Sequence, residues 1–114
     1  MSNIYLLDTL IVPINFNIYR YSYIKVERIS IEKAKQILQN NEFISAISHE
    51  ATAKLLSKLL GIKIPVNRNT VFFELGDIGI HFFLKERLPE GKFLTQKELK
   101  ELDYWLVKSW VYIT

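Results

Sequence analysis

The first apolar run of the chain, residues 4–12, predicts a buried strand. Pro13 closes this run, because proline cannot donate a hydrogen bond to a sheet. Asp8 and Thr9 interrupt it with two polar side chains, which conflicts with burial. Three explanations stay open: the two residues could face a ligand, face a neighbouring subunit, or be hydrogen-bonded within the sheet.

Residues 22–29 alternate between apolar and polar positions and predict a second strand. Ser30 follows as a suitable helix N-cap, and apolar residues at helical spacing predict an amphipathic helix over residues 31–39. A short apolar segment, residues 43–47, separates this helix from the next one.

A second helix is predicted over residues 49–60, with Ser48 as its N-cap and Gly61 as its C-terminal stop. Residues 62–66 suggest a short extended piece after it. The buried face of the helix is predicted to consist of Ala51, Leu55, Leu56, Leu59 and Leu60.

Residues 70–75 and 78–85 predict two strands of a hairpin, because the Gly76-Asp77 pair between them is typical of a tight turn. Residues 88–91 predict a further turn.

Thr95 and Glu98 form a capping-box pattern that predicts a short helix over residues 96–102. An aromatic-rich strand over residues 104–113 ends the chain. Because helices interleave with strands, we expect an α/β fold: one domain over residues 1–114, with a mixed sheet of about five strands flanked by helices.

Composition narrows the class of protein. A chain of 114 residues suits one domain, and 49% hydrophobic residues exclude disorder. The absence of cysteine excludes disulfides, thiolate metal sites and a cysteine nucleophile. No signal peptide and no apolar run of about 20 residues is visible, so a soluble intracellular protein is expected. The net charge of +3 suits an anionic ligand but is too small for a protein that coats a nucleic-acid duplex.

The two histidines restrict the chemistry. His49 and His81 have no metal-ligand spacing, and no glycine-rich phosphate loop is present, so an enzyme with this sequence would use metal-free acid–base chemistry. His49 is predicted at a helix start, where free backbone N–H groups attract phosphate and an imidazole could protonate a departing oxygen. It could equally be a plain solvent-facing residue. His81 lies on the opposite strand face from Ile80 and Phe82, and we interpret it as a structural or surface residue.

Two polar turns could add cationic groups to a site. Arg87 ends a predicted strand and Glu90 lies in the turn after it, where an arginine fork could neutralise a phosphate. The pair could also be an ordinary surface ion pair. Asn67 and Arg68 form another polar turn with the same two interpretations.

Together, these segments resemble those of the type III anti-CRISPR ring nucleases, small proteins of archaeal viruses and of some bacterial and phage genomes. The resemblance covers nearly the whole chain and rests on residues 5–9, 45–52, 65–68 and 87–92. Its most specific parts are the Ile-x-His-x-x-Thr pattern around His49 and the Arg-Leu-x-Glu-Gly-Lys pattern that begins at Arg87.

The resemblance implies a homodimer that binds cyclic tetra-adenylate, the second messenger of type III CRISPR defence, in a pocket across the dimer. It implies cleavage without metal or other cofactor, to linear di-adenylate with 2′,3′-cyclic phosphate ends. Such a virus-encoded protein would act in the host cytoplasm against the host's immunity, with neither a membrane nor duplex nucleic acid as partner.

The family's catalytic residues match His49, Arg87 and Glu90 of this chain. Substrate binding is expected from Asp8, Thr9, Ser48, Glu50, Thr52 and Arg68. Two departures stand out: Ser48 replaces a usual glycine, which is harmless if it caps the helix, and Asp8 replaces a usual asparagine, which puts a negative charge near a polyanion.

Two rival functions remain at this stage. A non-catalytic sponge would sequester the cyclic nucleotide in the same pocket. A general nucleic-acid-binding or structural viral protein would show a broader basic face and a steep salt dependence of binding.

Overall fold

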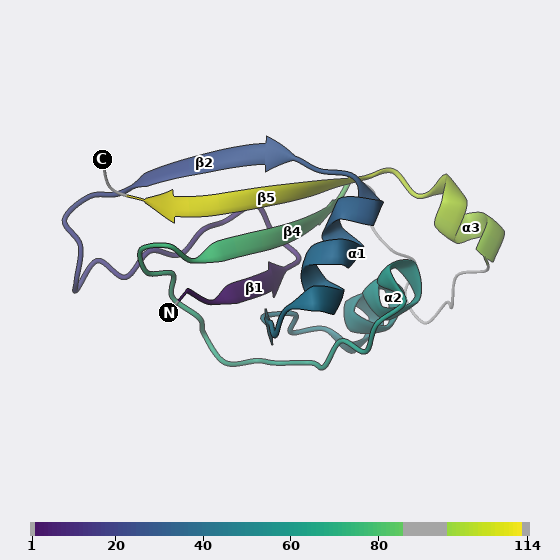
Figure 1. Ribbon diagram of the computed structural model, residues 1–114. Coiled ribbons are helices and arrows are strands. Elements are labelled where there is room, and N and C mark those ends of the chain that lie inside the picture. Colours follow the sequence, from purple (N-terminus) through teal and green to yellow (C-terminus); the bar gives the residue numbers. More distant parts are fainter. Residues whose placement is uncertain (1, 86–95, 113–114) are drawn as a thin grey trace.

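The computed structural model describes residues 2–85 and 96–112, which form a five-stranded mixed sheet with helices packed against it (Figure 1). The strand order is β2-β5-β4-β1-β3. The strands are β1 (Ile4–Leu7), β2 (Tyr23–Arg28), β3 (Ile44–Ser45), β4 (Ile78–Leu84) and β5 (Tyr104–Tyr112). β1 pairs in parallel with both β3 and β4, whereas β5 is antiparallel to both β4 and β2. The expected α/β class with a mixed sheet of five strands is therefore confirmed.

Three helices of the described residues interleave with the strands in the expected order: α1 (Ile31–Asn40), α2 (Glu50–Leu60) and α3 (Gln96–Glu101). α1 begins as predicted, because the Ser30 hydroxyl accepts a hydrogen bond from the backbone N–H of Lys33 at 3.1 Å. α2 ends at Gly61, whose φ of 67° is the left-handed conformation that glycine adopts without a steric penalty. In the described ranges no helix has the length and apolar character needed to cross a membrane.

The two faces of the sheet are covered differently. α1 and α2 pack on one face, over Leu6, Ile80 and Phe82, and form the larger core (Figure 1). Irregular chain covers the other face: Ile14 and Phe73 pack there. The second face is therefore covered by loops, among them the loop that follows β1.

The predicted first strand is shorter than its apolar run. β1 ends at Leu7, and the chain bends at Asp8, Thr9 and Leu10 instead of continuing to Val12. The two polar residues thus mark the end of the strand. The prediction erred because the apolar residues after the bend were counted as strand, whereas Val12 packs from a loop onto the second face.

The predicted hairpin is wrong. Residues 70–75 form no strand; only Phe73 makes an isolated parallel bridge, to Ile14. Similarly, residues 62–66 form no strand. The apolar character of residues 70–75 has a different cause. Phe73 is fully buried against the second face of the sheet without belonging to a strand.

Two expectations about α2 also need correction. His49 occupies the N-cap position, so Ser48 lies one residue before the cap and does not cap the helix. Ala51 is exposed, whereas Ala53 is buried with Leu55, Leu56 and Leu60. The helix start at Glu50 explains the first error. The second arises because Ala53, Leu56 and Leu60 share the buried face at helical spacing, and Ala51 lies outside it.

The turn before β4 is closed by the side chain of Asp77, which is 2% exposed. One carboxylate oxygen accepts the backbone N–H of Asn3 at 2.8 Å, and the other accepts the N–H of Glu74 at 2.8 Å. Gly76 forms the tip of the turn, with a φ of 86°. Asp77 thus joins the beginning of β1 to the turn that leads into β4, where the sequence predicted a hairpin.

Asp77→Ala is expected to lower the free energy of unfolding by about 2–4 kcal/mol, because the buried carboxylate is lost and two partly buried N–H groups lose a charged acceptor. Chemical denaturation of the purified variant measures this loss. Asp103→Ala is the matched control: its carboxylate is exposed and pairs with Lys85 at 3.2 Å, so about 0–1 kcal/mol is expected. Equal losses in the two variants would contradict the role given to Asp77.

Candidate functional site

The parallel strands β1 and β3 end side by side, and the candidate site residues follow these ends. Leu6 of β1 pairs with Ser45 of β3, and the Leu6 carbonyl accepts the N–H of Ala46 at 2.8 Å. Asp8 and Thr9 follow β1, while His49 follows β3. Ligands of open α/β sheets bind outside the carboxyl ends of parallel strands, so this edge is the candidate site.

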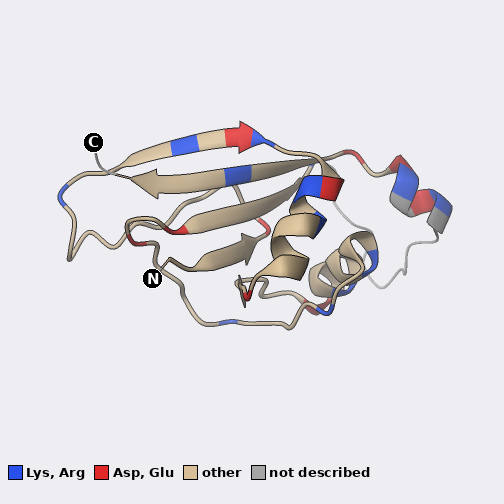
Figure 2. Ribbon diagram, in the orientation of Figure 1, with Lys and Arg blue, Asp and Glu red and all other residues tan. Residues whose placement is uncertain are grey.

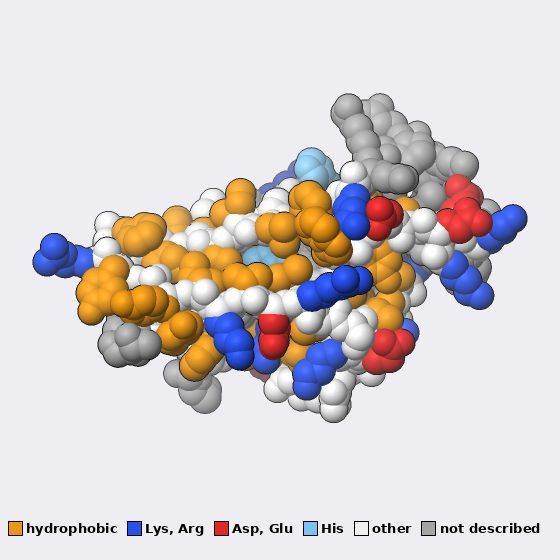
Figure 3. All heavy atoms as spheres, turned by 90° about the horizontal axis from the view of Figure 1, so that it is seen from above, with side chains coloured by type: hydrophobic (Ala, Val, Ile, Leu, Met, Phe, Trp, Pro, Cys, Tyr) orange, Lys and Arg blue, Asp and Glu red, His pale blue; other side chains and the backbone are white. Residues whose placement is uncertain are grey.

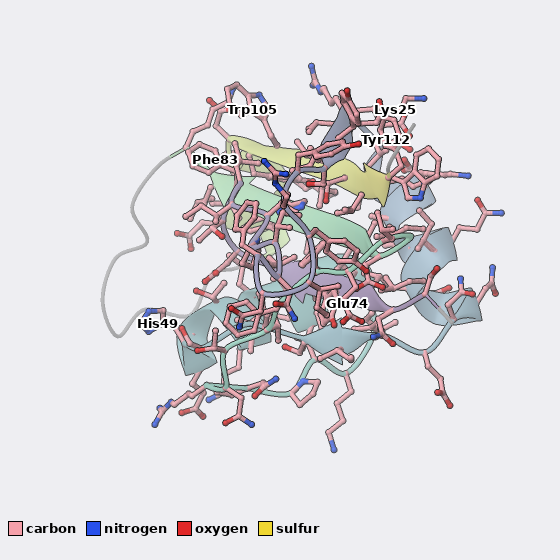
Figure 4. All side chains as sticks on the ribbon, turned by 90° about the vertical axis from the view of Figure 1, so that its left-hand side faces the viewer. Lys25, His49, Glu74, Phe83, Trp105 and Tyr112 are labelled. Atoms are coloured by element: carbon pink, nitrogen blue, oxygen red, sulfur yellow. The ribbon has the colours of Figure 1, made fainter. Side chains whose placement is uncertain are left out.

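His49 stands at the N-cap of α2, exposed and directed away from the sheet (Figure 4). Its carbonyl accepts the first helical hydrogen bond, from Ala53 at 3.0 Å. Its side chain forms no cap, so the imidazole does not occupy the first N–H groups of the helix. The helix start therefore combines an open N-terminus, which attracts anions, with a side chain able to donate a proton.

A turn at residues 67–69 is fixed against the chain that leads from β3 to α2. The side-chain amide of Asn67 donates to the Ser45 carbonyl at 2.7 Å, and its backbone N–H donates to the Ile47 carbonyl at 2.9 Å. The Asn67 side-chain oxygen accepts the N–H of Asn69 at 3.0 Å. Asn67 thus fixes the turn against the chain that leads from β3 to α2. Sequence reasoning placed Asn67 in a polar turn but did not predict these hydrogen bonds.

Arg68 follows directly and brings a cation to the start of α2. Its Nε donates to the carbonyl of Ser48 at 3.4 Å, while the residue stays exposed. The guanidinium therefore lies beside the backbone that leads into His49, with further N–H groups for a phosphate. The structure thus brings Arg68 beside His49, and its role in a site stays a prediction.

The remaining predicted binding residues lie around the same edge. Ser48 and Thr52 are half-buried. Glu50 is exposed, and its carboxylate pairs with Lys54 one turn along α2 at 3.2 Å. This pair directs Glu50 along the helix.

The two positions after β1 differ in exposure: Asp8 is half-buried and Thr9 is exposed. The Thr9 carbonyl accepts a hydrogen bond from His81 on β4 at 2.7 Å. Of the three explanations for these polar residues, a hydrogen bond to the sheet thus holds for the Thr9 backbone, and their side chains remain available to a ligand or a second subunit.

Arg87 and Glu90, the two other predicted catalytic residues, lie outside the described residues, as do Thr95 and the turn at residues 88–91. β4 runs parallel to β1 and ends at Leu84, at the same end of the sheet as the end of β1. In residues 2–85 and 96–112, no three His, Asp or Glu side chains lie together as a metal site would require.

Charged residues do not gather on one face of the described chain. Lys and Arg residues lie on β2, β5 and the helices, and acidic residues stand among them on β2, α1 and α3 (Figure 2). A protein that coats a nucleic-acid duplex presents a continuous basic face. The distribution thus favours a small anionic ligand over a long duplex.

The fold and this edge define a small α/β protein with a candidate site at the ends of parallel strands. The family description STIV B116-like matches residues 4–106. The chain therefore belongs to this family, which is the family of viral anti-CRISPR ring nucleases that its sequence motifs resemble.

Individual relatives agree with this assignment. ORF117 of Acidianus two-tailed virus is 49% identical over 104 residues, covering 89% of this chain and 86% of that protein. YddF of Bacillus subtilis is 39% identical over 84 residues, covering 72% and 78% of the two chains. The solved structure of B116 of Sulfolobus turreted icosahedral virus superimposes with a TM-score of 0.81 at 24% identity, covering 96% of this chain and 99% of that one. This last similarity shows a shared fold.

Proposed function

We propose that this chain is a metal-independent ring nuclease that cleaves cyclic tetra-adenylate to linear di-adenylate with 2′,3′-cyclic phosphate ends. It would act in the host cytoplasm and counter type III CRISPR immunity. The observation that carries the proposal is the position of His49, an exposed imidazole at an uncapped helix start. Membership of the STIV B116-like family supports it.

Cleavage of the ring needs an acid and a stabiliser of charge. The 2′-oxygen of a ribose attacks the adjacent phosphorus and loses its proton to water, while the bond from phosphorus to the 5′-oxygen breaks. The 5′-oxygen must gain a proton as it leaves, and protonated His49 is the proposed donor. The added charge on phosphorus would be stabilised by the N–H groups at the start of α2 and by Arg68.

The resemblance adds two residues to this scheme. Arg87 is proposed to neutralise the phosphate further, and Glu90 to orient Arg87 or His49 or to contact a ribose. Asp8, Thr9, Ser48, Glu50 and Thr52 are proposed to bind the ring around this edge.

A homodimer is part of the proposal, because a two-fold dimer offers two equivalent sites to a ring of four equivalent nucleotides. Exposed apolar side chains support self-association. They gather along the face in Figure 3, and Val26 on β2 and Ile11 after β1 are 60% and 66% exposed. Large apolar patches on soluble proteins are typical of interaction surfaces.

Excess substrate separates the nuclease from a sponge. The ring is supplied at about a hundredfold molar excess over the protein, in EDTA, and the remaining ring is measured with time. We expect the ring to be consumed completely. If consumption stops at one ring per dimer, or if the ring is bound and recovered intact, the protein is a sponge.

A further inference from the structure

His81 is a buried polar side chain that contacts the loop of the candidate site. It lies on β4 opposite Leu7 of β1 and is 1% exposed. Its Nδ1 lies 2.7 Å from the Thr9 carbonyl oxygen, and its Nε2 lies 2.7 Å from the Ser109 hydroxyl. Both ring nitrogens are therefore engaged, one by the loop after β1 and one by β5.

The carbonyl fixes which ring nitrogen carries the proton. A carbonyl oxygen only accepts, so Nδ1–H is the donor to Thr9. In the neutral ring Nε2 then accepts the hydroxyl proton of Ser109. Burial lowers the pKa of His81, and the bond to the Thr9 carbonyl only partly opposes this effect. The neutral ring, with its proton on Nδ1, is thus the stable form.

The absence of a side chain at Gly79 leaves room for the His81 ring beside Ser109. A Cβ on Gly79 would lie 2.5 Å from His81 Nε2 and 2.5 Å from the Ser109 hydroxyl oxygen. A side chain at this position would displace the ring or its partner. The arrangement therefore depends on β4, which supplies Gly79 and His81, and on β5, which supplies Ser109.

The bond to Thr9 acts on the loop that carries two proposed substrate-binding residues. This loop bends away from β1 at Asp8 and Thr9. Among bonds between described residues, the one from His81 is the only side-chain hydrogen bond to residues 8–12. The direction in which the chain leaves β1 thus depends on His81.

We infer that His81 is a positioning residue of the candidate site: its Nδ1–H donates a hydrogen bond to the Thr9 carbonyl and so sets the placement of Asp8 and Thr9 against the ligand. The inference rests on the proposed function and deepens it. His81 is buried on the second face of the sheet, so it acts on the substrate through Thr9 and not by touching the ring.

Two substitutions separate the bond to Thr9 from the bond to Ser109. In His81→Asn the amide nitrogen is bonded to Cγ, as Nδ1 is in histidine, so it can still donate a hydrogen bond to the Thr9 carbonyl. In His81→Gln the amide lies near the position of Nε2, so it can reach Ser109 but leaves Thr9 without a donor. Both variants remove a buried ring and should melt at a lower temperature than the wild type.

The measurement is the KM and kcat for cyclic tetra-adenylate at a temperature where all variants are folded. For His81→Gln we expect KM to rise about tenfold with kcat changed less than about threefold, because one neutral hydrogen bond is lost. His81→Asn should stay within about threefold of wild type in both constants. Ser109→Ala, which keeps the Thr9 contact, should behave like His81→Asn. Equal KM values for the Asn and Gln variants would overturn the inference.

A second readout does not require activity. The amide of Leu10 belongs to the same peptide group as the Thr9 carbonyl, and its hydrogen exchange should be faster in His81→Gln than in His81→Asn. An inactive wild type would reject the proposed function alone, whereas equal Leu10 exchange in the two variants would reject the positioning role of His81.

Discussion

His49→Ala is expected to lower the single-turnover rate of ring cleavage by about 10²–10⁴-fold, the usual contribution of a general acid. His49 is exposed and its side chain caps no backbone group, so its removal should leave the melting temperature unchanged. The affinity for the ring should change only a few-fold, because the N–H groups of α2 and Arg68 remain.

His49→Gln provides a matched test of the acid role. Glutamine keeps a polar side chain of similar size but donates no proton to a leaving oxygen near neutral pH, so it should lose as much rate as alanine. Gln39→Ala, at an exposed position of α1, is the control for handling of the protein. Cleavage by His49→Ala at the wild-type rate would remove His49 from the mechanism.

The second large effect is structural. Phe73→Ala is expected to lower the free energy of unfolding by about 3–5 kcal/mol, the usual cost of deleting a buried aromatic ring. Phe73 is 0% exposed and stacks on Tyr5 with ring centroids 4.7 Å apart. Its backbone N–H donates to the Pro13 carbonyl at 2.7 Å. Removal of the Phe73 ring should therefore loosen the loops that cover the second face of the sheet.

The adjacent residue supplies the control. Phe72 is the same residue type, one position away, and is 54% exposed. Phe72→Ala should cost no more than about 0.5 kcal/mol, as surface substitutions do. Denaturation of both variants measures the difference. If the two losses were similar, the irregular segment would contribute little to the core.

The sequence predicted the elements with strong local signals. Ser30 caps α1 and Gly61 ends α2 as expected, because capping depends on one side chain or one backbone conformation. β4 and β5 were also placed correctly within a residue or two. These signals lie within a few residues of the element that they define.

The predictions that failed depend on contacts far along the chain. Whether the segment around Phe73 is a strand or a loop depends on the face of the sheet against which it packs, and alternation within the segment cannot show this. Likewise, the end of β1 at Leu7 is linked to His81 through Thr9, 72 positions away in sequence.

The candidate site was predicted in its parts and less well in its assembly. His49 at a helix start and Arg68 in a polar turn were visible from the sequence. Asn67 was assigned to the same turn, but its hydrogen bonds to Ser45 and Ile47, which hold Arg68 beside Ser48, were not predicted. An Asn in a polar turn has many ordinary roles, so only the folded chain distinguishes this one.

The most direct test of the central claim is the chemical identity of the product ends. Wild-type protein is incubated with excess cyclic tetra-adenylate in EDTA, and the products are resolved by mass spectrometry. Attack by the 2′-oxygen predicts linear di-adenylate with 2′,3′-cyclic phosphate and 5′-hydroxyl ends. Intact ring, or products with 3′-hydroxyl and 5′-phosphate ends, would contradict the account.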